Sequence, residues 1–344
     1  MVLNRCYRHC SHCGTYCFPV ERSLGLPKRY STTLKRFAAR CCGFWSYALS
    51  AQNLNALCGI RLSPTIVGEI ADEVGGIIDT LLPDNGAIRE RFQKAKGETE
   101  FYIDGTCVHV LNEAGEPVYC EMKVGALVKR EPSDGCMPEE CGTRELEKPT
   151  IVSAFAAIED KAAFQKRCQN ERRRLGVGGV TSALGDGALW IWSLVFFVFG
   201  KTMECLDIYH ALEHVATCGK ALYGSGSAFT EWFEGVRLVL LSEGFAGMER
   251  ELLALKELDA DQQKAVQSLL DYLGKNKERL RYAERLATGR SIGSGLIEGA
   301  CKNLVKRRLK QTGACWRVPR ANRSAVICAA LYSNQWDDCW KKYH

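Results

Sequence analysis

The chain has 344 residues, of which 46% are apolar and 25% charged, a composition typical of a folded soluble protein with room for two domains. Its longest apolar run covers residues 188–200, which is shorter than the roughly 17–25 residues of a membrane-spanning helix, so we expect no membrane span. No apolar segment typical of a signal peptide follows Met1, and the sequence therefore predicts a cytoplasmic protein. In a reducing compartment its 18 cysteines are expected to be thiols or metal ligands.

The net charge of +6 is unevenly distributed along the chain. Residues 302–323 contain eight basic and no acidic residues, and residues 5–40 contain eight basic residues and one acid, Glu21. A single basic run is commonly a solvated helix face, but two such runs favour a polyanionic partner, because phosphate binding releases counterions in proportion to the charges neutralised. Nucleic acid is the leading candidate, and we expect the contacts to come from Lys302, Lys306, Arg307, Arg308, Lys310 and Arg317.

The first segment, residues 1–30, is rich in cysteine and in turn-forming residues. Cys10 and Cys13, followed by glycine, match the Cys-x-x-Cys-Gly of a zinc knuckle, which makes them candidate ligands of a Zn²⁺ ion. Two interpretations stay open: the pair forms a compact four-ligand set with Cys6 and Cys17, or it is one half of a zinc ribbon whose second half is missing.

The second segment, residues 31–95, is predicted to be helical. One helix over residues 46–57 is followed by Gly59, a typical C-terminal stop, and Ser63-Pro64 is a typical start for a second helix that continues to Leu82. Two helices joined by a short turn are the outline of a DNA-binding helix-turn-helix, although any two packed helices give the same pattern.

The third segment changes to a two-residue period. Strands are predicted at residues 101–111, 118–128, 179–187 and 203–207, with a helix at 159–175 between the second and third strands. A hairpin, a helix and further strands make an α/β sheet domain over residues 96–207. Residues 208–288 are helical in character throughout, and residues 289–344 carry a basic helix.

Three carboxylates stand in apolar, glycine-flanked settings. Asp104 lies within the first strand, Asp186 between two glycines at the end of the third, and Glu298 near the start of the basic helix. A carboxylate in an apolar setting is costly unless it is paired or bound to a cation. Oxygen ligands of high charge suit Mg²⁺ or Mn²⁺, and two such ions can clamp the attacking and leaving oxygens of a phosphodiester. The pattern predicts metal-dependent phosphodiester chemistry.

The same residues lie in blocks that resemble the DDE transposases of bacterial insertion sequences, most closely the ISKra-type family. The resemblance extends from about Cys10 to Trp340. The blocks that carry it are YIDGT (102–106), LGDGALWIW (184–192), DIYHALEH (207–214), IGSGLIE (292–298) and RLKQTGACW (308–316).

The resemblance implies an RNase H-like catalytic domain, formed by residues 96–207 and 289–344 and interrupted by an all-helical insertion at residues 208–288. Asp104, Asp186 and Glu298 are then the catalytic triad that binds Mg²⁺ or Mn²⁺. Asp207 and His210 form the family's Asp-x-x-His element. That element either supports the chemistry near the scissile phosphate or marks a strand-to-helix junction in which Asp207 is a cap and His210 packs.

We therefore expect an insertion-sequence transposase that binds the ends of its element, cuts DNA and transfers the strands to a target. Joining two ends calls for at least two active sites, so a homodimer or higher oligomer on DNA is expected, associated with the nucleoid. The alternative is a shortened, catalytically inactive copy that still binds DNA, an interpretation that the missing half of the zinc ribbon favours.

Overall fold

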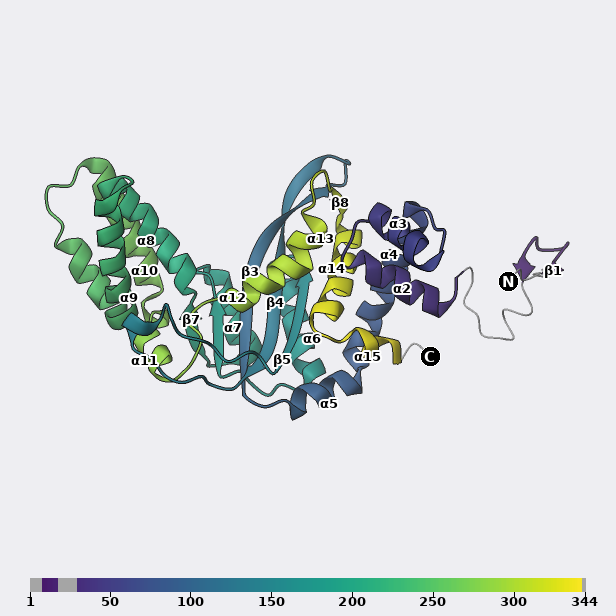
Figure 1. Ribbon diagram of the computed structural model, residues 1–344, viewed down its shortest axis with the longest axis horizontal. Helices are drawn as coiled ribbons and strands as arrows, with labels where there is room; N and C mark the ends of the chain where they lie inside the picture. The colour runs from purple at the N-terminus through teal and green to yellow at the C-terminus, as the bar shows by residue number, and fades with distance from the viewer. Residues whose placement is uncertain (1–7, 18–29, 342–344) are drawn as a thin grey trace.

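The computed structural model describes residues 8–17 and 30–341 and is organised around a mixed β-sheet (Figure 1). Within these residues the sheet has six strands in the order β5-β4-β3-β6-β7, with β8 paired to β3. Strands β3, β4 and β5 are antiparallel, whereas β3, β6 and β7 run parallel. The strands are β3 (Glu98–Leu111), β4 (Pro117–Arg130), β5 (Ile151–Ala157), β6 (Ser182–Gly185), β7 (Met203–Leu206) and β8 (Trp316–Arg317). The predicted α/β class is confirmed.

The centre of the sheet is the long hairpin of β3 and β4. Its register runs from Glu98 opposite Arg130 to Leu111 opposite Pro117. The connecting turn contains Gly115 with a φ of +82°, a backbone conformation that favours glycine. The two strands predicted from the alternating pattern are confirmed, and each is 14 residues long.

Helices cover both faces of the sheet (Figure 1). One hydrophobic core joins Tyr102 and Leu184 of the sheet to the C-terminal elements and to the helical bundle, and a second joins Phe101 and Ala183 to the opposite layer. The C-terminal elements of the first core are α12 (Gly295–Ala300), a π-helical turn η4 (Cys301–Lys306), α13 (Arg307–Leu309) and α14 (Val318–Tyr332), whereas α15 (Trp336–Lys341) packs into the second core. The opposite layer contains α6 (Lys161–Leu175) and α7 (Leu189–Phe199).

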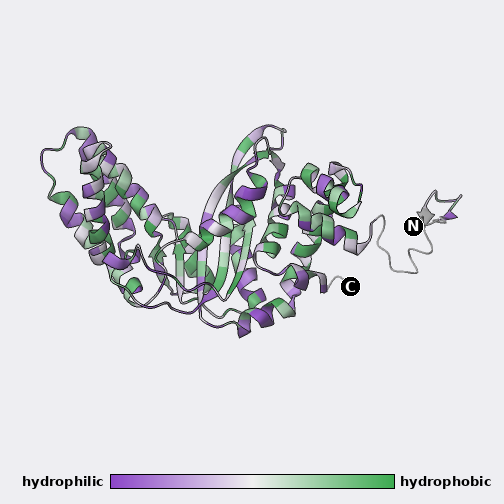
Figure 2. Cartoon of the chain, viewed as in Figure 1, coloured by the Kyte–Doolittle hydropathy of each residue, from purple (hydrophilic) through white to green (hydrophobic). Residues whose placement is uncertain are grey.

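The stretch that was expected to be all-helical forms a bundle at one end of the molecule (Figure 1). It consists of α8 (Ile208–Tyr223), α9 (Ser227–Leu253), α10 (Ala260–Lys275) and α11 (Tyr282–Ala287). Hydrophilic and hydrophobic residues alternate along these helices, as amphipathic packing requires (Figure 2). Helix α9 kinks at Gly244, where φ is +63° and an added Cβ would lie 2.8 Å from the carbonyl oxygen of Leu280.

At the other end of the sheet, a group of N-terminal helices packs against α14. Serine side chains cap three of them: Ser31, Ser46 and Ser63 each accept a hydrogen bond from the backbone amide three residues later. Gly59 ends the second of these helices in the left-handed conformation, φ +66°, as the sequence predicts. The helices are α2 (Thr32–Cys42), α3 (Tyr47–Cys58), α4 (Pro64–Leu81) and α5 (Gly86–Lys94).

Two elements are absent from the sequence-based prediction. Strand β5 reads Ile-Val-Ser-Ala-Phe-Ala-Ala and is buried on both faces over its last five residues, so no alternation marks it. Helix α7 is apolar on all sides and therefore has no polar face from which a helical period could be recognised. In the part of the chain that the structure describes, no helix is both long and apolar enough to cross a membrane.

The expected basic helix of the last segment is not continuous. Helix α12 passes into the π-helical turn at Cys301, α13 ends at Leu309, and a loop with β8 precedes α14. The third predicted strand is also shorter than expected, because β6 ends at Gly185 and Asp186 is the first residue beyond it. Both differences place potential site residues at irregular backbone instead of inside regular elements.

The contact between α4 and α14 generates a stability prediction with an internal control. An alanine Cβ at Gly75 would lie 2.6 Å from the carbonyl oxygen of Arg323, whereas at Gly76 the nearest atom is the Arg323 side-chain nitrogen at 3.6 Å. We expect Gly75→Ala to lower the free energy of unfolding by about 1–3 kcal/mol through forced separation of the two helices. Gly76→Ala should raise it by about 0.5–1 kcal/mol. Urea unfolding of both variants measures the difference, and equal effects would contradict the close packing.

Candidate functional site

Aspartates lie just beyond the last paired residues of the parallel strands. The aligned positions inside β3, β6 and β7 are Tyr102, Leu184 and Cys205. Two residues further along each strand stand Asp104, Asp186 and Asp207. Side chains two residues apart in a strand point to the same face, so this register brings the three acids into one row. The amide of Asp207 donates to the carbonyl of Gly185 at 2.9 Å, which continues the pairing up to the row.

Asp104 anchors the C-terminal segment to the sheet. Its Oδ1 accepts the backbone amide of Gly105 at 2.7 Å, and its Oδ2 accepts a hydrogen bond from Sγ of Cys301 at 3.5 Å. Burial and the neighbouring Asp104 carboxylate raise the pKa of Cys301, so this thiol stays neutral and remains a donor. The π-helical turn is thereby held directly over the first acid.

Asp186 follows β6 and is partly buried. Its Oδ1 accepts the amide of Ala188 at 2.8 Å. Burial raises the pKa of Asp186, and the carboxylates of Asp104 and Glu121 raise it further, while His210 and the Ala188 amide act in the opposite direction. Among the described residues, neither Asp104 nor Asp186 forms an ion pair with a lysine or arginine. The two acids thus form an electronegative position without a basic counterion.

Glu298 approaches the row from the helix above it. It lies on α12, three residues before Cys301, and its backbone amide donates to the carbonyl of Ser294 at 2.9 Å. Residues three apart on a helix are neighbours on one face, with Cβ atoms about 5–6 Å apart, so Glu298 starts one turn from the residue that touches Asp104. Its side chain is exposed, and its charge contributes to the raised pKa of Tyr209, which burial and Asp207 also raise.

Asp207 is the most buried acid of the row, with 1% exposure, and it has a structural task. Its Oδ1 accepts the amides of Tyr209 at 3.1 Å and Ser294 at 3.0 Å, and its Oδ2 accepts the Ser294 hydroxyl. Burial raises the pKa of Asp207, and these hydrogen bonds oppose the rise. It caps α8 and ties that helix to the start of α12, which agrees with the capping interpretation. His210 is not packed inside: its side chain is 37% exposed, with Nε2 3.9 Å from Asp207 Oδ2 and Nδ1 3.4 Å from Glu213 Oε2.

The donors at this site suit a hard divalent cation. Asp104 and Asp186 offer carboxylate oxygens side by side, and burial together with the charge of Asp104 raises the pKa of Asp186. In the described part of the chain, no group of three or more histidine, cysteine, aspartate or glutamate side chains lies close enough to hold a metal ion. The two aspartates fit a Mg²⁺ or Mn²⁺ ion, and the exposed Glu298 stands one helical turn away.

Two residues at this site were not identified from the sequence. Glu121, on the strand paired with β3, contributes to the pKa of Asp186; the position of the predicted hairpin turn was the signal that could have located it. Tyr272 reaches over from α10 so closely that a Cβ at Gly187 would lie 2.6 Å from its ring, and burial with the charges of Asp186 and Asp207 raises its pKa. Nothing in the sequence marked Tyr272, because a bundle residue 86 positions from Asp186 carries no local signal.

Most of the expected DNA-binding residues are exposed, and one of them reaches the strand that carries Asp104. Nζ of Lys310 donates to Oγ1 of Thr106 at 2.6 Å, two residues beyond Asp104 on the same strand. Arg307 lies over the ring of Phe44 with its guanidinium carbon 5.1 Å from the ring centre. We call this surface the basic ridge; its members are Lys302, Lys306, Arg307, Lys310 and Arg317.

Arg308 departs from the expectation and does not belong to the basic ridge. It is 3% exposed, and its Nε donates to the carbonyl of Cys42 at 2.7 Å. Its guanidinium lies between the rings of Tyr47 and Trp316, 4.6 Å from each ring centre. Arg308 therefore joins the C-terminal segment to the N-terminal helices and has no free face for a phosphate.

The N-terminal helices also differ from the expected DNA-reading element. Helix α4 contains four carboxylates and no basic residue, so its field repels phosphate. Two basic residues of α2 that lack acidic neighbours in sequence are paired in the fold, Lys35 with Glu73 at 2.6 Å and Arg36 with Asp337 at 2.5 Å. Helices α3 and α4 thus carry no basic residue of their own, and DNA binding by this helix-turn-helix-like region stays a prediction.

The two candidate zinc ligands lie in a short hairpin of β1 (Arg8–His9) and β2 (Tyr16–Cys17). The amide of Gly14 donates to the carbonyl of Cys10 at 2.9 Å, and both thiols are exposed. Hydrogen bonds from Thr15 and from Cys10 lower the pKa of Cys13 to about 7, which favours the thiolate that a metal requires. Cys6 and the side chain of Cys17 lie outside the described residues, and so the choice between a four-ligand set and half a ribbon rests on the sequence.

Comparison with known proteins adds no identification, since no model of a known protein family matches the chain and no curated protein matches it in sequence.

The contrast between Asp186 and Asp207 generates a prediction on stability. Because the pKa of Asp186 is raised in the fold, its ionised form lowers stability once the pH exceeds the unfolded-state pKa. We expect Asp186→Asn to raise the unfolding temperature of the metal-free protein at pH 7, and the gain to disappear below about pH 4, where both states are protonated.

Asp207→Ala is the matched control for that experiment. It removes a helix cap and the bonds to Ser294, and it should lower the free energy of unfolding by about 2–4 kcal/mol. Calorimetry of both variants across pH tests the pair. Destabilisation by Asp186→Asn at pH 7 would show that Asp186 is a structural acid like Asp207.

Proposed function

We propose that the protein is a DNA transposase with an RNase H-like core, which cuts and rejoins phosphodiester bonds with the help of a divalent cation. The observation that carries the proposal is the position of Asp104 and Asp186 just beyond the parallel pairing of β3 and β6, without a lysine or arginine partner among the described residues, next to the helix that bears Glu298. The resemblance to ISKra-type transposases assigns catalysis to the same three residues.

The topology supports the core that the proposal requires. An RNase H-like sheet needs a hairpin that carries the first acid, a helix, and a parallel strand that carries the second acid. Here β3, β4 and β5 form an antiparallel meander, α6 follows, and β6 returns parallel to β3. The helical bundle of residues 208–287 then lies between the second acid and Glu298 along the chain, where the family's insertion is expected.

Each acid has a distinct task in the proposed reaction. Asp104 and Asp186 would hold the cation, and the Ala188 amide fixes one oxygen of Asp186. Glu298 completes the set from α12, whose distance from the sheet is set by the contact of Cys301 with Asp104. When bound, divalent ions lower the pKa of the attacking water or hydroxyl and stabilise the leaving oxygen. His210, exposed beside Asp207, is placed to contact the phosphate that is being cut.

The basic ridge supplies the DNA-binding surface of the proposal. Lys310 donates to Thr106, which stands two residues along the strand from Asp104, so a DNA backbone that contacts Lys310 lies close to the acids. The basic ridge would neutralise DNA phosphates, and the carboxylates would act on the bond to be cut. Binding and cutting would therefore depend on different residues. The hairpin that carries Cys10 and Cys13 adds a candidate contact to DNA that would depend on Zn²⁺. Joining two element ends requires at least two copies of the chain on the DNA.

The proposed chemistry predicts that the three acids are needed for cutting and not for binding. Asp104→Asn, Asp186→Asn and Glu298→Gln should each lower nicking by at least about 100-fold, since a cation supplies several kcal/mol of transition-state stabilisation and 1.4 kcal/mol is a factor of ten. The substrate is a supercoiled plasmid that carries the DNA flanking the coding sequence, assayed with Mg²⁺ and with Mn²⁺. Binding in EDTA should be unchanged.

Glu121→Gln is the control for this assay, because Glu121 lies in the same field without belonging to the proposed triad. It should retain nicking within a few-fold of the unaltered protein. Loss of activity in Glu121→Gln alone would overturn the triad. An unaltered protein that binds this DNA but never nicks it would favour the alternative of an inactive DNA-binding copy.

The basic ridge predicts a specific change in salt dependence. Replacing Lys306, Arg307 and Lys310 by alanine should flatten the slope of log K against log salt by roughly 2–3, at about 0.9 for each phosphate that is no longer neutralised. A variant that loses Lys256, Lys264 and Lys277, three exposed lysines of the helical bundle, makes the same change in net charge and should keep the slope. Arg308→Met should lower thermal stability without altering the slope. Fluorescence titrations at several salt concentrations measure these slopes, and an unchanged slope in the ridge variant would exclude the ridge as the DNA path.

A further inference from the structure

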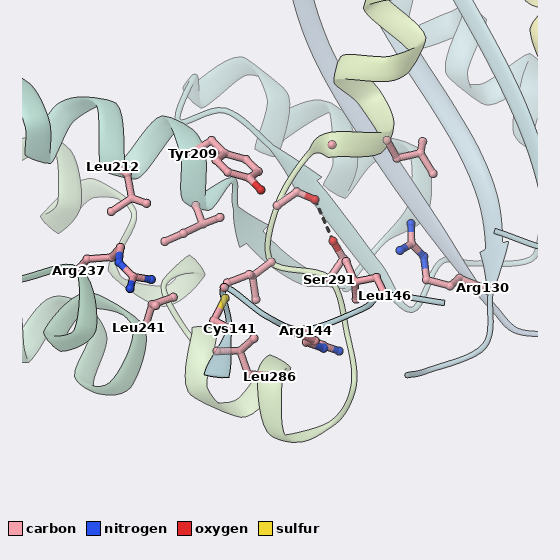
Figure 3. Close-up of a pocket in the computed structure, with 16 residues that line it drawn as sticks. Arg130, Cys141, Arg144, Leu146, Tyr209, Leu212, Arg237, Leu241, Leu286 and Ser291 are labelled. Atoms are coloured by element: carbon pink, nitrogen blue, oxygen red, sulfur yellow. Dashed lines mark hydrogen bonds between the residues drawn. The ribbon is translucent and has the colours of Figure 1, made fainter. Parts of the chain in front are cut away.

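A cavity of about 530 Å³ lies where the helical bundle meets the segment that leads to α12 (Figure 3). Residues of α8 and α9 line one side, and the loop at Cys141–Leu146 and the segment 291–296 line the other. Gly293 passes so close to the ring of Tyr209 that an added Cβ would lie 2.8 Å from it. Tyr209 therefore touches the segment that leads to Glu298, and that segment lines the cavity as far as Leu296.

The charged residues of the cavity are all basic. Arg130, Arg144 and Arg237 line it, and among the described residues no aspartate or glutamate does. Figure 3 shows Arg237 and Arg130 on opposite sides of the space, with Arg144 below. Arg130 pairs with Glu100 at 3.3 Å and Arg237 with Glu234 at 2.9 Å, so two of the three cations already have an acid.

Arg144 is the exception among the three. Its Nη1 donates to the carbonyl of Arg290 at 3.0 Å, but Nε and Nη2 are buried and have no hydrogen-bond partner. No carboxylate pairs with it within residues 8–17 and 30–341. These two nitrogens are covered by protein atoms, so the feature that points to a ligand is that Arg144 lines the cavity with no carboxylate partner. A guanidinium in that setting suits an anionic ligand such as a phosphate or a carboxylate.

The remaining wall restricts the kind of anion. Leu212 and Leu241 lie beside Arg237 and across the cavity from Arg130, and Leu286 extends this apolar part (Figure 3). The volume is in the range of small-ligand sites, about 300–1,000 Å³. Tyr209 adds an aromatic ring of 55% exposure at the rim, a surface on which a base can stack. A ligand that satisfies this site has one anionic end and one flat apolar end.

We infer that the cavity binds a single nucleotide unit, with its phosphate on Arg144 and its base against the leucine side near Tyr209. The choice of a nucleotide over other anions with an apolar body rests on the proposed function. The same chemistry is offered by a free nucleoside monophosphate and by an unpaired nucleotide of bound DNA. In the second case the site holds one nucleotide beside Glu298 and so fixes the position of the strand relative to the acids.

The first arm of the test uses deoxyadenosine monophosphate and inorganic phosphate as probes, with the full chain in the Asp186→Asn background and EDTA. Calorimetric titration should show the nucleotide binding at least tenfold more tightly than phosphate. Arg144→Gln should weaken it by about tenfold or more, as expected for the loss of hydrogen bonds to a charged group. Arg281→Gln, which removes an arginine paired with Glu278 away from the cavity, should leave it unchanged.

The second arm uses duplex DNA with 2-aminopurine at the unpaired end nucleotide. Its fluorescence should rise on binding as the base leaves the stack, and the rise should be lost in Arg144→Gln and in Leu212→Trp, which fills the cavity without changing charge. Leu212→Trp also serves if the arginine variant fails to fold. A response in the first arm alone identifies a free nucleotide as the ligand, and one in the second alone identifies a nucleotide of the substrate.

Equal affinity for phosphate and nucleotide, or no response in either arm, would overturn the inference. These outcomes are separate from the proposed function, since the first arm needs neither DNA nor cutting. Nicking that depends on the three acids, together with no nucleotide binding, would leave the transposase proposal intact and remove only the cavity from it.

Discussion

Parallel pairing of β3, β6 and β7 is the constraint on which the rest of the site depends. Because these strands share one register, the positions after Tyr102, Leu184 and Cys205 must come together at one edge of the sheet. The acids at that edge belong to parts of the chain separated by about 100 residues, so no local preference could assemble them. The hydrophobic core beneath them holds the register, since a slip by one residue would move every apolar side chain to the wrong face.

Partly buried carboxylates that lie close together repel one another and lower the free energy of unfolding that the hydrophobic core provides. Asp207 resolves the conflict by hydrogen bonding to Ser294 and the start of α8, which makes it a clamp between two distant segments. Asp186 has fewer such bonds, because the Ala188 amide is the one donor found for its carboxylate among the described residues. Burial raises the pKa of both acids, so the contrast between them lies in their hydrogen bonds: Asp207 joins two segments, whereas one oxygen of Asp186 has no hydrogen-bond partner in the described part of the chain.

Local signals in the sequence were sufficient for a large part of the fold. The hairpin of β3 and β4 follows from alternation and a glycine turn, and α3 and α4 follow from serine caps and from Gly59. Strand β5 and helix α7 escaped prediction because uniform burial erases the period that identifies an element. All three proposed catalytic acids could be selected from their glycine-flanked settings, but the exposed position of Glu298 could not, since it depends on how α12 lies over the sheet.

Charge was the property that sequence alone described least well. Residues 302–323 look like one basic surface, yet the fold places Arg308 between two aromatic rings. Likewise Lys35 and Arg36 find acids 38 and 301 residues away. The net charge of a segment therefore indicates a polyanionic partner only when its basic residues are neither buried nor paired with acids in the folded protein. The five members of the basic ridge remain exposed, whereas α2 keeps few free cations.

The helical bundle contributes to the site at two places, and this gives it a role beyond linking the second acid to Glu298. Tyr272 from α10 lies against Gly187 next to Asp186, and its ring stacks on His214 at 3.7 Å between ring centres. On the other side of α8, Tyr209 and Arg237 turn toward the segment that carries Glu298. The bundle therefore contacts the surroundings of both the second and the third acid. A displacement of α8 would move both contacts together, because Asp207 joins the start of that helix to Ser294.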